Sequence, residues 1–221
     1  MIVGLFFVVL GLIAVLWAER AESTTPGDAL VLACAWGGKV LASTGFMVAA
    51  LLPGIPGGTY AAAVVTALVL SFAGDLLLVP KGAQRAFLAG LVSFLLGHVA
   101  YAFAFAALGL PTVPTLVAFA VIAGPAIVVG RYFVTRASAA MKAPVIAYIV
   151  VISAMVALAT GATWKTGEPL LLIAALLFYV SDVFVARQRF VGPEFLNRAV
   201  GLPLYYAAQL IFALTLGIFS R

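Results

Sequence analysis

Eight long apolar runs follow one another along this chain. A helix of roughly 20 apolar residues spans the hydrocarbon core of a bilayer, and a helix also satisfies its own backbone hydrogen bonds there. Short segments rich in Pro and Gly separate the runs. The pattern predicts an all-α membrane protein, an eight-transmembrane-helix bundle in which residues 1–221 form a single domain. The expected spans are 2–18, 29–50, 59–79, 86–108, 113–131, 143–160, 168–187 and 200–219.

The composition supports this class and excludes several kinds of site. Hydrophobic residues make up 66% of the chain and charged residues 9%, whereas about 25% of the residues of a soluble domain are charged. Since basic residues in short loops set membrane orientation, the net charge of +5 does not indicate a nucleic-acid partner. A single cysteine, Cys34, excludes an intrachain disulfide, and a single histidine, His98, excludes a three-histidine metal site. We therefore expect neither a metal nor a cofactor.

The basic residues predict how the bundle is oriented. Two of them, Lys165 and Arg221, fall on one side of the expected spans. The others fall on the opposite side: Arg20, Lys81, Arg85, Arg131, Arg136, Lys142, Arg187, Arg189 and Arg198. By the positive-inside rule this second side faces the cytoplasm. The prediction is a multi-pass protein of the cell (inner) membrane with both termini on the non-cytoplasmic side.

Two aspartates lie inside apolar spans. Asp75 ends the sequence Phe72-x-Gly74-Asp75 in the third span, and Asp182 ends a similar sequence, Tyr179-x-Ser181-Asp182, in the seventh. An acidic side chain within a membrane span costs several kcal/mol, so both carboxyls are expected to face the bundle interior and to serve a function. The alternative is a structural role, in which each carboxyl pairs with Lys39 or with a tyrosine.

Further polar residues are expected inside the spans. They are Lys39, Ser71, His98, Tyr148, Ser181, Tyr205, Tyr206 and Gln209. They are candidates for supporting or substrate-binding roles, although tyrosines near an interface also serve as membrane anchors and Ser or Gln side chains also bond across helices. Tyr205 follows Asp182 at the interval at which His98 follows Asp75. This spacing leaves open a fold of two parallel four-helix repeats, which would bring the carboxyls together near a pseudo-twofold axis.

The order of these motifs resembles the lysoplasmalogenase family of integral membrane proteins (YhhN-like). Besides Lys39 and Tyr148, the resemblance rests on Ser71-x-x-Gly74-Asp75, Gly97-His98-x-x-Tyr101, Phe178-x-x-Ser181-Asp182 and Tyr205-Tyr206-x-x-Gln209. One departure is Val40, where many relatives have Pro. The resemblance implies an eight-span, metal-independent hydrolase that cleaves the vinyl ether bond of lysoplasmalogens, releasing a fatty aldehyde and glycerophosphocholine or glycerophosphoethanolamine. The family's polar set corresponds here to Lys39, Asp75, His98, Tyr148, Asp182 and Gln209.

The two carboxyls suit this chemistry. Vinyl ether hydrolysis needs a proton donor, an anion that faces an oxocarbenium ion, and a held water, as glycoside hydrolysis does. Burial favours the neutral form of a carboxyl, so one of two neighbouring carboxyls can stay protonated. Asp75 and Asp182 are therefore the candidate catalytic residues, and the sequence leaves open which one is the acid. Lys39 can hold one of them ionised or bind the substrate phosphate.

The expected partners are a vinyl ether lysophospholipid and the membrane lipids, whereas the sequence indicates no oligomeric state. Arg85, Lys81 and Arg187 are expected near the cytoplasmic mouth, where cations attract phosphate. The main alternative is a proton-coupled transporter of a small molecule or lipid that uses the same two aspartates. An intramembrane aspartyl protease is disfavoured, because Phe72 stands where its Gly-x-Gly-Asp motif needs glycine. The polar set disfavours a purely structural protein.

Overall fold

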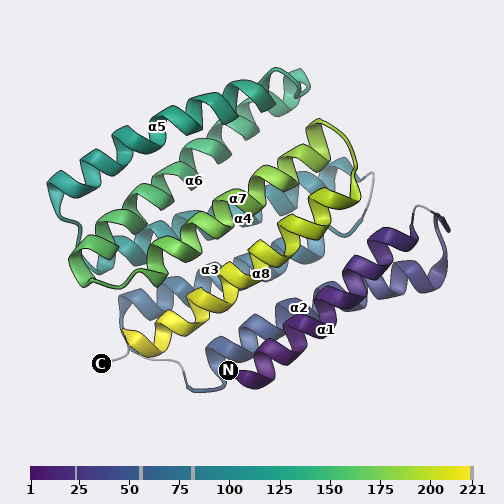
Figure 1. The fold of residues 1–221 in the computed structure, drawn as a ribbon, viewed down its shortest axis with the longest axis horizontal. Helices are drawn as coiled ribbons and strands as arrows, with labels where there is room; N and C mark the ends of the chain where they lie inside the picture. The colour runs from purple at the N-terminus through teal and green to yellow at the C-terminus, as the bar shows by residue number, and fades with distance from the viewer. Residues whose placement is uncertain (23, 55–56, 81–82, 220–221) are drawn as a thin grey trace.

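The computed structural model of the chain consists of eight helices (Figure 1). The structure describes residues 1–22, 24–54, 57–80 and 83–219. The helices are α1 (Ile2–Ala21), α2 (Ala29–Leu51), α3 (Thr59–Leu77), α4 (Gln84–Ala107), α5 (Thr112–Val134), α6 (Ala139–Thr166), α7 (Leu170–Phe190) and α8 (Phe195–Ile218). Within these ranges there is no strand, and all eight helices are long and apolar enough to cross a membrane. The expected eight-helix membrane bundle is confirmed, and the protein is a multi-pass membrane protein.

Local chemistry sets several helix ends. The Asp28 carboxylate accepts hydrogen bonds from the backbone N–H groups of Leu30 and Val31, which caps the start of α2. Gly167, with φ of 74°, ends α6 in the left-handed conformation that glycine adopts without steric cost. These residues place the turns where the sequence predicts them.

Helices α6 and α8 extend furthest beyond their expected spans. Helix α6 has 28 residues and continues through Gly161, which the sequence suggested as the start of a break. A Cβ at Gly161 would collide with the Thr115 side chain of α5, so this glycine permits close helix contact and does not end the helix. Helix α8 begins at Phe195, several residues earlier than expected. Arg198 therefore lies on the same helix as Tyr205.

The two halves of the chain have matching helix contacts. The pair α1 and α2 lies at one edge of the bundle and the pair α5 and α6 at the other, with α3, α4, α7 and α8 between them (Figure 1). Helix α2 packs against α3 and α8, whereas α6 packs against α7 and α4. Two parallel four-helix repeats would produce this pairing, because each half's second helix meets its own third helix and the fourth helix of the other half.

Glycines bring α1 and α2 into close contact. A Cβ at Gly38 would lie 2.8 Å from the Gly11 carbonyl oxygen, and a Cβ at Gly4 would lie 2.5 Å from that of Gly45. Helix backbones approach this closely where both surfaces carry small residues. The contact fixes α2, and with it Lys39, the residue after Gly38.

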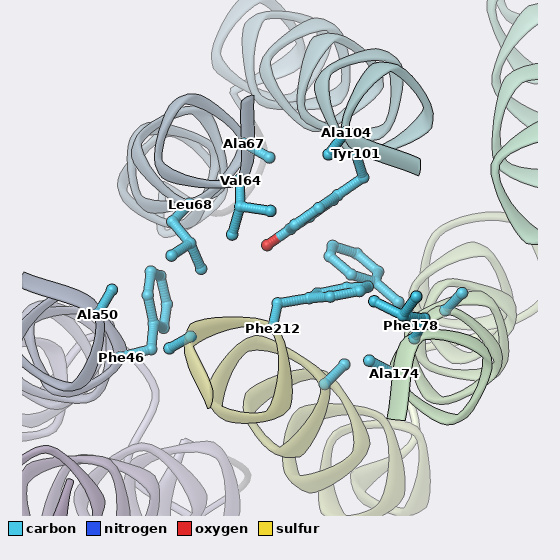
Figure 2. Close-up of a cluster of buried hydrophobic side chains, with 14 of the residues drawn as sticks. Phe46, Ala50, Val64, Ala67, Leu68, Tyr101, Ala104, Ala174, Phe178 and Phe212 are labelled. Carbon is cyan, nitrogen blue, oxygen red and sulfur yellow. The ribbon is translucent and has the colours of Figure 1, made fainter. Parts of the chain in front are cut away.

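An apolar core lies in the middle of the bundle, with buried side chains from α1, α2, α3, α4, α6, α7 and α8. Phe46, Leu68 and Phe178 are among those shown in Figure 2. The Tyr101 ring stacks on Phe212, with centroids 4.0 Å apart. Close packing of this kind fixes the axial positions of the helices that carry the polar residues.

Candidate active site

Asp75 lies in the last turn of α3 and is 1% exposed. Its Oδ1 accepts a hydrogen bond from Lys39 Nζ at 2.7 Å. Its Oδ2 accepts two more, from Ser43 Oγ and from the Tyr205 hydroxyl, each also at 2.7 Å. A buried charge is stable only when it is paired and hydrogen-bonded. Three donors, one of them an ammonium, hold Asp75 as an ionised carboxylate.

Helix geometry explains two of these donors. Lys39 and Ser43 are four residues apart on α2, so both face Asp75. The Lys39 ammonium also lies 5.9 Å and 5.7 Å from the ring centroids of Tyr205 and Tyr206, within the range of cation–π attraction. Ser43 was not predicted from the sequence, although its spacing from Lys39 is a signal that could have identified it.

Asp182 occupies a more open setting on α7. Its side chain is 16% exposed, and its Oδ2 accepts a hydrogen bond from the Tyr148 hydroxyl of α6 at 2.8 Å. His98 Nε2, from α4, lies 3.3 Å from the same oxygen, although the imidazole is not aligned for a hydrogen bond. Among the described residues, Asp182 is therefore contacted by a histidine and a tyrosine and by no lysine.

The hydrogen bond of Nδ1 sets the tautomer of a neutral His98. His98 Nδ1 lies 2.6 Å from the Phe94 carbonyl oxygen, and since a carbonyl only accepts, Nδ1 carries a hydrogen. Nε2, which lies 3.3 Å from the Asp182 oxygen, is then the ring nitrogen that can take up a further proton.

Both carboxyls line one cavity, which has about 90 Å³ of room for the centres of water molecules. Lys39, Tyr148, Ser181 and Tyr205 contribute the other polar positions expected from the sequence. The rest of the wall is mainly apolar, and α5 and α6 supply Val129, Phe133, Val145 and Ile149. A mainly apolar cavity that is also lined by two carboxyls suits an amphiphile with a single chain.

Four candidates lie off the cavity wall. His98 is behind Asp182, whereas Ser71, Tyr206 and Gln209 are buried in the core. Ser71 and Gln209 each lie one helical turn from a residue of the wall, Asp75 and Tyr205 respectively. Gln209 Oε1 accepts a 2.6 Å hydrogen bond from the Tyr101 hydroxyl. The hydroxyls of Ser71 and Tyr206 are buried without a hydrogen-bond partner among the described residues.

Arg198 lines the cavity, although it is not among the basic residues expected at the cytoplasmic mouth. Arg187 instead donates a 3.3 Å hydrogen bond to Asn197 and lies 3.9 Å from Glu194. Arg85 is exposed at the start of α4, and Lys81 lies outside the described residues. The sequence did not single out Arg198 because it placed this residue in a loop.

The two carboxyl sites are built in the same way. Asp75 of α3 is contacted from α2 by Lys39 and from α8 by Tyr205. Asp182 of α7 is contacted from α6 by Tyr148 and from α4 by His98. Each carboxyl therefore receives contacts from the second helix of its own half and the fourth helix of the other half. Among the described residues no group of three or more His, Cys, Asp or Glu side chains could hold a metal ion.

Comparison with known proteins places the chain in a family. Residues 34–216 match the sequence profile of the YhhN family. A Bos taurus protein named Lysoplasmalogenase TMEM86A is 33% identical over 156 residues. That match covers 67% of this chain and 62% of the bovine protein, so the chain aligns with less than two thirds of its relative. No solved structure gives a significant match. Because the profile covers most of its length, the chain belongs to the YhhN family.

Proposed function

We propose that this protein is an intramembrane hydrolase that cleaves the vinyl ether bond of lysoplasmalogens to a fatty aldehyde and glycerophosphocholine or glycerophosphoethanolamine. The observation that carries the proposal is that Asp75, ion-paired with Lys39, and Asp182, 3.3 Å from His98, line one cavity. The activity in the name of the bovine relative agrees with it. The proposed route uses no metal and no cofactor.

The first step is proton transfer to carbon. Asp182, which shares its proton with His98, protonates the vinyl ether carbon β to the oxygen, and the π electrons of the double bond form the new C–H bond. The oxygen lone pair stabilises the cation left on the adjacent carbon as an oxocarbenium ion. Asp75 faces this cation as the counter-charge, since Lys39 keeps it ionised. Tyr148 orients the Asp182 carboxyl through its 2.8 Å hydrogen bond.

The second step consumes one water. Water adds to the oxocarbenium carbon and gives one of its protons to the Asp182 carboxylate, which restores the acid. The resulting hemiacetal collapses: the carbon–oxygen bond to glycerol breaks, the glycerol oxygen takes a proton, and the aldehyde forms. The apolar wall of α5 and α6 accommodates the hydrocarbon chain throughout.

The test is aldehyde release by purified protein in detergent. A vinyl ether lysolipid should yield aldehyde, its acyl ester analogue should not be cleaved, and a chelator should have no effect. Asp75→Asn and Asp182→Asn should each lower kcat by roughly 10²-fold or more, the scale of a lost acid or base. Asp28→Asn is the matched control, because Asp28 only caps α2.

Two outcomes would contradict the proposal. One is cleavage of the ester with no aldehyde from the vinyl ether, and the other is full activity in both site variants. If the variants instead abolish uptake of a substrate into vesicles while no aldehyde forms, the protein is a proton-coupled transporter.

A further inference from the structure

A second, larger cavity adjoins the first one. Its volume is about 1110 Å³, and the ends of α1, α3, α4, α7 and α8 surround it. Leu78, Phe87 and Arg198 line both cavities, so the two spaces meet at these side chains. All of these helix ends belong to the arginine-rich end of the bundle. The second cavity is therefore an entrance to the candidate active site.

Two arginines mark the junction. Arg198 lies on α8 seven residues before Tyr205, and Arg189 lies on α7 seven residues after Asp182. Seven residues make two helical turns, or about 10 Å, so each arginine shares a helix face with its site residue. The Arg189 guanidinium covers the ring of Phe87 at 4.3 Å. Each arginine thus lies two turns from a residue of the candidate site, Arg198 from Tyr205 and Arg189 from Asp182.

Arg198 has an unused donor. Its side chain is 19% exposed, and its Nε is buried without a hydrogen-bond partner in the described part of the chain. The nearest acidic group is the Glu19 carboxylate, whose Oε1 lies 3.7 Å from Nε, beyond hydrogen-bond range. A buried guanidinium N–H left unpaired is costly, which favours a ligand that accepts from it.

We propose that Arg198, with Arg189, binds the phosphate of the lysolipid headgroup in the second cavity. The identity of the ligand rests on the proposed function. The phosphorus of such a lipid lies six bonds from the vinyl ether carbon that carries the oxygen, or about 7.6 Å at the ~3.8 Å that three extended bonds span. This span is shorter than the roughly 10 Å rise of two helical turns, and the long arginine side chain has to cover the difference. Guanidinium groups bind phosphate through paired N–H donors.

The charges around the cavity restrict where the phosphate lies. Three arginines, Arg20, Arg189 and Arg198, line it together with three glutamates, Glu19, Glu22 and Glu194. The formal charges of these six described residues balance, so together they do not attract anions indiscriminately. The phosphate therefore binds at the junction, where Arg198 lines both cavities and Arg189 covers Phe87, which also lines both.

The experiment separates headgroup binding from catalysis. Isothermal titration in detergent measures the affinity for a saturated alkyl ether lysophosphocholine, which cannot be hydrolysed, and for the corresponding alkylglycerol, which lacks phosphate. Arg198→Gln should weaken binding of the phospholipid roughly 10- to 100-fold, the scale of a charged hydrogen bond, and should leave alkylglycerol binding unchanged. Arg136→Gln, at an exposed arginine that covers Tyr132, is the control and should behave as wild type.

Glu19→Gln tests the purely structural explanation. If Arg198 serves only to pair with Glu19, both variants weaken binding alike, and that result would overturn the proposal. If Arg198 binds phosphate, Glu19→Gln binds the phospholipid as tightly as wild type or more tightly.

Two more results bear on the source of the phosphate and on the reaction. If inorganic phosphate binds through Arg198 and the phospholipid does not, the site binds a free anion, and the headgroup assignment is overturned. Arg198→Gln can weaken phospholipid binding and leave alkylglycerol binding unchanged while no aldehyde forms from a vinyl ether substrate. In that case the phosphate-binding site stands and the proposed reaction fails.

Discussion

At the scale of single residues, Lys39 and Asp75 form a buried ion pair. The Lys39 side chain is 11% exposed and that of Asp75 is 1% exposed, with 2.7 Å between the charged atoms. A pair of this kind contributes little net stability, because both charges lose their hydration. Removal of one partner costs far more, since the other charge is then buried alone. The pair is best explained by the charge state that it imposes on Asp75.

A single and a double variant separate stability from activity. Lys39→Met should lower the free energy of unfolding by about 3 kcal/mol, because Asp75 is left without its cation. Lys39→Met combined with Asp75→Leu should recover most of that loss and remain inactive. The measurements are thermal unfolding in detergent and aldehyde release.

Lys165→Met is the control for the loss of a lysine, because Lys165 is exposed at the end of α6. A single Lys39→Met variant that unfolds at the wild-type temperature would refute the interpretation of the ion pair.

Individual site residues were predictable to different degrees. Asp75 and Asp182 stand out in the sequence because a charge in an apolar span needs an explanation. Ser43 and Arg198 do not stand out, because their roles depend on which helices are neighbours. Hydrophobic periodicity shows that a helix is buried and does not identify its partner. Periodicity does not predict, for example, that α4 contacts α6, the contact that brings His98 toward Tyr148.

At the scale of helices, α3 and α4 meet at a glycine beside Asp75. A Cβ at Gly74 would lie 2.6 Å and 2.7 Å from the Cε2 and Cδ2 atoms of Phe94. The Phe94 ring is buried and packs edge-on against Tyr205 and Phe178, with centroids 5.8 Å and 6.3 Å away. The glycine before Asp75 therefore keeps this aromatic group, and the Tyr205 hydroxyl, in place.

We expect Gly74→Ala to displace Phe94 and disturb the hydrogen bond from Tyr205 to Asp75. Overpacking of this kind costs roughly 1–3 kcal/mol, and kcat should fall at least about 10-fold. Thermal unfolding and aldehyde release measure the two effects, and adding Phe94→Leu should restore part of the activity.

Gly124→Ala is the matched control, because nothing lies within 4 Å of a Cβ at that helical glycine. It should be neutral or slightly stabilising. A Gly74→Ala protein as active as wild type would show that the close contact with Phe94 does not matter.

The apolar runs predicted the eight helices, because length and hydropathy alone decide whether a segment can span a bilayer. Helix ends were less predictable. Gly161 was interpreted as a turn residue, but it serves the contact between α6 and α5. The first turn of α8 was missed because Asn197 and Arg198 are polar, and both bury their side chains largely against neighbouring helix ends.

At the scale of the whole molecule, both carboxyls depend on helices from both halves of the chain. Neither half alone contains a complete site, since Tyr205 reaches Asp75 from the second half and His98 reaches Asp182 from the first. This exchange of fourth helices explains why the two aspartates have similar sequence settings. Both termini lie at one end of the bundle (Figure 1). That the arginine-rich end faces the cytoplasm stays a prediction.

The central claim is that a fixed donor, the His98–Asp182 pair, delivers a proton to one face of a vinyl ether held opposite Asp75. The most direct measurement is to run the reaction in D₂O, trap the aldehyde at once as its alcohol, and analyse the carbon next to the new C–O group. The account predicts one deuterium per molecule in a single configuration, and no product from Asp182→Asn. Product without deuterium, or with deuterium in both configurations, would contradict it.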